Sequence, residues 1–265
     1  HGTYLSSSKG NSNVIKVDKI WYQFPVGEQN TVFIGPLIEN YYMHGTTPSI
    51  YKPVLKAFTL GGNGAAYGAS TDTGAGWSYK ADNGFAVSSN IGTKSKTTQE
   101  DANENYLESG LLTNETKTSW ATQIGLTKEQ YAVSAMVNLK YNGWSDSYFT
   151  AGSAQTGNTT NYGLRAWWRP LETGTATPEV SLGYDYTTIA DVADTVDSTD
   201  AYFVGLTWLD TFNADDRIGI AFGQPQTRED NDADPFMWEA YYSFKPNDSV
   251  TITPTIVIVL YCLFK

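Results

Sequence analysis

The chain is poor in the residues on which several protein classes depend. It contains 1 Cys and 2 His among 265 residues. A single cysteine supplies no disulfide framework, and clusters of Cys and His that bind metal are excluded by the same counts, so we expect no cofactor and no metal site. Acidic residues outnumber basic ones, 28 to 17. Nucleic-acid binding requires a basic surface, so nucleic acid is not an expected partner.

Long apolar runs are also missing. A transmembrane helix requires 18 or more consecutive apolar residues, whereas the longest run here, residues 256–264, has nine. That length suits a strand. Aromatic residues, by contrast, make up 14% of the chain, which excludes a disordered protein. A membrane β-barrel has no long apolar run either, so the missing runs leave both a soluble and a membrane β-protein open.

Period-two alternation of apolar and polar residues is the main pattern. It predicts β-strands, about twelve in all, each near the length that a tilted strand needs to cross a bilayer. The clearest segments are 131–141, 161–169, 179–186, 201–208 and 236–245. Weaker copies or strand-like runs lie at 14–24, 31–38, 73–81, 85–91, 120–126, 218–222 and 250–259.

The two faces of these strands differ in a way that indicates the solvent. One face is apolar with aromatic residues at the strand ends, and the other is small or polar. Aromatic residues at both ends of an apolar band are typical of the two membrane interfaces. A soluble β-sandwich, which buries its apolar face and exposes charged residues, is the alternative, because its strands alternate similarly.

The connections alternate between short and long. Short periplasmic turns opposite longer outer loops are typical of outer-membrane barrels. We therefore predict an all-β transmembrane antiparallel up-and-down β-barrel of porin type, a single domain over residues 1–265 in the cell outer membrane. An even strand number is required when both termini are periplasmic. This predicts a barrel truncated at both ends, in which residues 260–265 have no clear place.

Several segments resemble cyanobacterial outer-membrane porins, relatives of the OprB-type carbohydrate-selective porins. They are VDKIWYQFPVGEQNTVFIGP at 17–36, GQP at 223–225 and WEAYYSFKPNDSVTITP at 238–254, while LKAFTLGG at 55–62 and ADNGF at 81–85 resemble the picocyanobacterial branch. The resemblance implies a 16-stranded homotrimeric barrel. It also implies a preceding S-layer-homology domain that ties the outer membrane to the cell wall and is absent from this sequence.

The long connection at residues 39–69 is the first candidate functional element. In general porins this connection folds into the lumen and narrows the pore, and a long loop without secondary structure is usually functional. The alternative is that it packs against neighbouring loops or a trimer interface. The predicted constriction residues are Tyr41, Tyr42, His44, Tyr51, Lys52 and Lys56.

Charged residues on the polar face are the second candidate set. A charge on the lipid face costs about 2–4 kcal/mol at mid-membrane, so these side chains are predicted to line the pore. Two aromatic residues on the same face suit sugar stacking, with plain packing as the alternative for Trp167. Because both signs of charge occur, we expect a wide, weakly selective lumen. The predicted pore-lining residues are Lys80, Lys140, Arg165, Trp167, Arg169, Glu179, Asp185, Glu239, Tyr241 and Lys245.

Two further features bear on function. Eleven Asp and Glu lie between Ala190 and Pro235, which suggests a cation-attracting vestibule, divalent bridging to lipopolysaccharide, or a solvated acidic loop. Only His1 and His44 could act as a histidine general base, and the chain lacks the Ser motif of a strand-to-helix elbow. We therefore predict that the chain is not an enzyme.

The predicted function is passive diffusion of small hydrophilic solutes, carbohydrates and ions, through a water-filled pore surrounded by outer-membrane lipid and lipopolysaccharide. One alternative is a porin for inorganic ions or iron. Another, of a different class, is a structural outer-membrane anchor or phage receptor.

Overall fold

The computed structural model describes residues 15, 17–64, 67, 71–95, 116–141, 158–190, 198–228 and 234–262. Within this part of the chain, neither helical turn is long and apolar enough to span a membrane. The strands are β1 Ile20–Val26, β2 Asn30–Glu39, β3 Thr71–Lys80, β4 Phe85–Ser95, β5 Thr116–Thr127, β6 Tyr131–Tyr141, β7 Thr159–Trp168, β8 Glu179–Ile189, β9 Ser198–Leu209, β10 Arg217–Arg228, β11 Asp234–Asn247, β12 Val250–Ile252 and β13 Thr255–Cys262. Two 3-10 turns, η1 Asn40–Met43 and η2 Lys56–Gly61, lie between β2 and β3.

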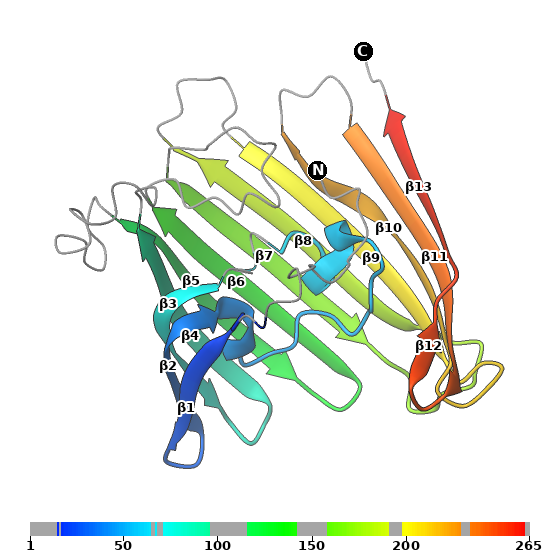
Figure 1. The fold of residues 1–265 in the computed structure, drawn as a ribbon, viewed down its shortest axis with the longest axis horizontal. Coiled ribbons are helices and arrows are strands. Elements are labelled where there is room, and N and C mark those ends of the chain that lie inside the picture. Colours follow the sequence, from blue (N-terminus) through cyan, green and yellow to red (C-terminus); the bar gives the residue numbers. More distant parts are fainter. Residues whose placement is uncertain are drawn as a thin grey trace.

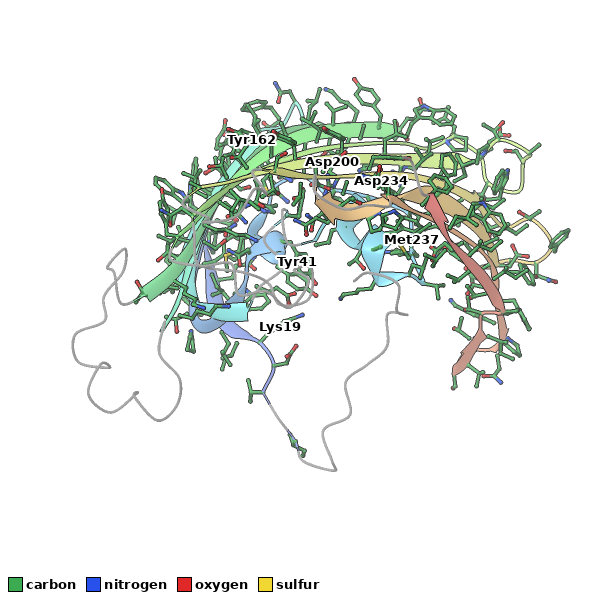
Figure 2. The ribbon with its side chains drawn as sticks, turned by 90° about the horizontal axis from the view of Figure 1, so that it is seen from above. Lys19, Tyr41, Tyr162, Asp200, Asp234 and Met237 are labelled. Carbon is green, nitrogen blue, oxygen red and sulfur yellow. The ribbon has the colours of Figure 1, made fainter. Side chains whose placement is uncertain are left out.

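All strands belong to one antiparallel sheet. Each strand from β1 to β12 pairs with the next in chain order, and β13 pairs with β11. Short turns lie along one rim of the sheet, and the sheet curves so that one face is concave (Figures 1 and 2). The predicted all-β, up-and-down antiparallel order is confirmed. Among the described residues no pairing joins β1 to β13, so the sheet is open.

Every predicted segment overlaps an observed strand, but several are shorter than that strand: 120–126 lies within β5 and 218–222 within β10. Alternation reproduced β6 to the residue. The segment 250–259, predicted as one strand, is two, because Pro254 has no N–H to donate to a ladder and its carbonyl instead accepts the Tyr242 N–H at 3.1 Å. The tail at residues 260–265, which the sequence pattern did not place, belongs in part to β13, since this strand continues to Cys262. At the other end β1 begins at Ile20 rather than at Val14, which lies outside the described residues.

The apolar face of the sheet is the convex, exposed one. Tyr162, Leu164 and Leu182 are 46%, 55% and 44% exposed, whereas Arg165, on the opposite face of the same region, is 3% exposed. A soluble sandwich would show the reverse, with the apolar side chains buried between two sheets. The arrangement excludes that alternative and matches an outward-facing apolar band.

Buried apolar side chains lie between the concave face and the β2–β3 connection. Leu55 and Phe58 of the connection pack with Phe203 of β9 and Met237 of β11 in the largest cluster. A second cluster joins Met43 to β2. The concave face is therefore covered by the chain's own loop rather than by a second layer of strands, and this loop is the candidate site.

Candidate functional site

The β2–β3 connection crosses the whole concave face. We call residues 40–64 the interior loop. Both of its helical turns lie on the concave side of the sheet, and Tyr41 lies beneath the arch of strands (Figures 1 and 2). Its contacts lead from β4 across β5, β7 and β8 to β11 and then back to β7 and β8. The interior loop thus crosses the concave face of the sheet twice and is fixed to it in both passes. We call this face of the sheet the wall.

Polar side chains of the wall hold the outward pass. The most complete bond is made by Gln123 of β5, whose Oε1 accepts the Thr46 N–H at 2.9 Å while its Nε2 donates to the Thr46 carbonyl at 2.9 Å. Further bonds join Asn40 Nδ2 to Asn90 Oδ1, Gly45 N to Ser88 Oγ, Trp167 Nε1 to Thr47 O and Ile50 N to Ser181 Oγ. The buried backbone N–H and C=O groups of a loop need hydrogen-bond partners. Side chains of the wall provide the partners that a neighbouring strand would provide in a sheet.

Glu239 of β11 holds the tip of the interior loop. Its carboxylate accepts the Tyr51 hydroxyl at 2.8 Å, the Leu55 N–H at 2.6 Å and the Val54 N–H at 3.3 Å. Glu239 is 0% exposed. Burial and the neighbouring Glu239 charge raise the pKa of Tyr51, which keeps its phenol protonated as a donor. Three donors therefore compensate one buried carboxylate.

An ion pair holds the return pass. Arg165 Nη2 lies 2.8 Å from Asp185 Oδ1, and both side chains are 1% exposed. The pair also contacts the loop, since Arg165 Nε donates to the Leu60 carbonyl at 2.8 Å and the Asn63 N–H donates to Asp185 Oδ2 at 2.9 Å. The Arg165 guanidinium lies 5.0 Å from the centre of the Tyr67 ring. Opposite charges and hydrogen bonds together satisfy both buried groups.

Glycines on the concave face make room for the interior loop. A Cβ on Gly183 would lie 1.6 Å from the Gly61 carbonyl oxygen, so the close approach of the two backbones requires glycine there. Gly125 and Gly205 stand in the same way under Thr46 and Tyr51. Inward-facing glycines on several strands are the sequence signal that could have indicated a loop packed against the concave face.

His44 of the interior loop is buried against β4. Its Nδ1 lies 3.2 Å from Ser88 Oγ, and its ring meets the Tyr67 ring edge-on with centroids 5.2 Å apart. Ser88 Oγ also accepts the Gly45 N–H. Burial lowers the pKa of His44 to about 4. The imidazole is therefore neutral at physiological pH.

The predicted constriction residues divide between buried and exposed. His44 and Tyr51 are buried against the wall. Tyr41 stacks on Tyr42 with ring centroids 4.4 Å apart, and Tyr42 is half exposed. Lys52 is exposed and Lys56 partly so. All belong to the loop that crosses the concave face, and their role in narrowing a pore stays a prediction.

The predicted pore-lining residues divide in the same way. Six are buried: Lys140, Arg165, Trp167, Asp185, Glu239 and Tyr241. The expected sugar-stacking surface of Trp167 and Tyr241 is wrong, because both rings are covered and the Trp167 indole donates to Thr47. The remaining four, Lys80, Arg169, Glu179 and Lys245, lie near short turns and keep some exposure. In the described part of the chain no three His, Cys, Asp or Glu side chains gather to hold a metal ion.

Comparisons with known proteins bear on the fold alone. Neither a family model nor a curated protein sequence matches the chain. Among solved structures it is similar to outer-membrane expressed OmpT of Vibrio cholerae, with a TM-score of 0.58 and 14% identity over 91% of this chain and 69% of that chain. The chain therefore has the fold of an outer-membrane β-barrel, with its sheet open in the described residues.

The prediction that the chain is not an enzyme is contradicted by this likeness. One fold can carry enzymes as well as channels, so the outer-membrane barrel fold does not support excluding catalysis. The prediction relied on scarce histidine and a missing Ser motif. Carboxylates also serve as general acids and bases, so those absences were not sufficient to exclude catalysis.

Proposed function

We propose that the chain is an outer-membrane porin that allows passive diffusion of small hydrophilic solutes. The observation that carries this proposal is the arrangement of the sheet: its apolar side chains face outward, and its polar side chains face a concave interior crossed by a fixed loop. An apolar exterior suits lipid and a polar interior suits water. The resemblance to cyanobacterial porins, a homotrimer and contact with lipopolysaccharide belong to the same proposal.

The interior loop supports a sieving role within this proposal. It is attached to five strands of the wall, β4, β5, β7, β8 and β11, so it holds one position across the lumen. A loop with so many wall contacts narrows the interior permanently, and solutes would pass beside its exposed side, where Tyr42 and Lys52 lie. Carbohydrates and ions small enough to pass this segment are the expected solutes.

Single-channel recording in planar bilayers tests the proposal. The reconstituted chain should give stable open channels, and deletion of residues 46–53, which removes the outward anchors, should raise the conductance. Deletion of residues 171–173, exposed in the short β7–β8 turn, is the matched control and should leave it unchanged. A folded protein that stays silent would contradict diffusion and support a structural role in the membrane. Equal conductance in both variants would contradict the sieving role.

A further inference from the structure

Charges of opposite sign are separated in space near the short turns. Four basic residues lie on the concave face at the short-turn ends of their strands, and we call them the basic ring: Lys80, Arg169, Arg217 and Lys245. Exposed carboxylates instead lie in the turns themselves: Glu28, Asp82, Glu129, Glu172, Asp215 and Asp248. The strand ends on the concave face thus carry mostly positive charge and the turns mostly negative charge, and the two meet where Lys245 Nζ lies 4.0 Å from Asp215 Oδ2.

Register and contacts place the basic ring on the concave face. Arg217 pairs with Ser243 two residues before the pair formed by Gly219 and the buried Tyr241, and residues two apart on a strand share a face. The Arg169 guanidinium lies 5.7 Å from the Trp167 ring. Lys80 Cε is 3.9 Å from the position of a Cβ on Gly45 of the interior loop.

One carboxylate opposes the basic ring on this face. Among the side chains that the structure describes, Glu179 is the single acidic group on the concave face at these strand ends, and it interacts electrostatically with Arg217 and Arg169. Arg217 Nε is buried there without a hydrogen-bond partner among the described atoms. The balance of charge at this end of the interior is therefore positive.

The carboxylates at mid-wall do not offset this charge. Asp185 is paired with Arg165, and Glu239 is enclosed by loop donors, so both are covered and compensated. On the interior loop itself Lys52 is exposed and Lys56 partly exposed, and both are cations. Acidic groups in the turns are open to solvent, where salt screens them over about 10 Å at 0.1 M. Charges inside a low-dielectric cleft keep a stronger influence.

We infer that the pathway favours small anions over cations, although the chain as a whole carries a formal charge of −11. The inference rests on the proposed porin function and names its solute class. Rings of Arg and Lys select anions, and guanidinium groups suit carboxylate and phosphate in particular. It replaces the weak selectivity expected from sequence, where buried and accessible charges could not be told apart.

Reversal potentials in a potassium chloride gradient test the inference. The intact chain should show a reversal potential with the sign that chloride permeation sets. Its magnitude should be larger at 0.1 M salt than at 1 M salt. Arg217→Glu and Lys80→Glu should each shift it toward the potassium value, and Glu179→Gln should shift it further toward chloride. Lys128→Glu, the same change on an exposed short turn, is the control and should leave it in place.

Each outcome separates this inference from the function on which it rests. Open channels that prefer potassium would overturn anion selectivity and leave diffusion intact. The absence of channels in a folded protein would overturn the porin proposal itself. If a charge reversal in the basic ring prevents folding, Lys52→Glu on the exposed loop provides the same test. The inference would be contradicted if the intact chain shows no chloride preference and the folded Lys52→Glu variant shows the same reversal potential.

Discussion

The charged groups at mid-wall and those of the basic ring lie on one face of one sheet, yet they have different surroundings. Arg165, Asp185 and Glu239 are enclosed beneath the interior loop, while Arg169 and Lys245 stand at strand ends with solvent access. Alternation along a strand decides which face a side chain takes. What covers that face decides whether its charge attaches a loop or acts on a solute.

The difference gives each group a distinct energetic role. A covered charge contributes through its hydrogen bonds and ion pair, so its loss leaves buried partners uncompensated. An accessible charge is screened and contributes little to stability, but under the proposed function it acts on passing ions. Substitutions in the two regions should therefore change different measurements, and the following predictions test that separation.

Breaking the buried ion pair should have the largest effect. Arg165→Met leaves Asp185 buried without its partner, which should lower the free energy of unfolding by about 3–5 kcal/mol. Urea unfolding in detergent micelles or liposomes measures this. Arg165→Met combined with Asp185→Leu should recover much of the loss, because no lone charge remains. A double variant as unstable as the single one would show that the contacts to Leu60 and Asn63 matter more than charge compensation.

Removing the carboxylate at the loop tip should have the next largest effect. Glu239→Ala leaves the N–H groups of Val54 and Leu55 without an acceptor, at roughly 1–3 kcal/mol for each buried donor, less what they regain by moving into water. The freed tip should also raise channel conductance and its noise. Glu179→Ala, a carboxylate on the same face away from the loop, is the control for conductance noise. Equal noise in both variants would contradict the anchoring role.

Acid should loosen the interior loop through His44. Its pKa is near 6.5 when the loop is free and lowered to about 4 when burial desolvates it. The loop-free state therefore binds the proton first, and attachment weakens as the pH falls from 6.5 to 4. Conductance noise should rise over that window, and His44→Gln should remove the dependence. A dependence that persists in this variant would assign the effect to another group.

Neutralising a member of the basic ring should have the smallest effect on stability. Lys245 lies 4.0 Å from Asp215, with side chains 51% and 76% exposed, and such a pair contributes at most about 1 kcal/mol. Lys245→Gln should therefore leave the urea midpoint nearly unchanged while shifting the reversal potential toward potassium. A large loss of stability instead would show that the two regions do not differ as described.

Much of this architecture was accessible from sequence. Alternation predicted the faces of β6 to β9 and β11, turn residues predicted the hairpins, and the length of the segment 39–69 marked it as a candidate functional element. That the interior loop covers Arg165 and Glu239 could not be predicted from the sequence. Arg165 binds Leu60, 105 residues away in the chain, and Glu239 binds Leu55, 184 residues away. Contacts between such distant residues leave no local periodicity to read.

The break at Pro254 illustrates a different cause of error. The segment 250–259 alternates well enough to suggest one strand, but a missing N–H interrupts the ladder at a single position. That position was visible in the sequence and was outweighed by the apolar run that follows it. Local chemistry at one residue prevailed over a regional pattern.

The distance between Tyr51 and Glu239, 188 residues along the chain, also sets an order of events during assembly. Early strands can pair as hairpins from neighbouring residues, whereas the tip of the interior loop cannot bind Glu239 until β11 has joined the sheet, and long-range closure of this kind is slow. The two passes can attach earlier to β4, β5, β7 and β8, so the tip is the part of the interior loop that is fixed last.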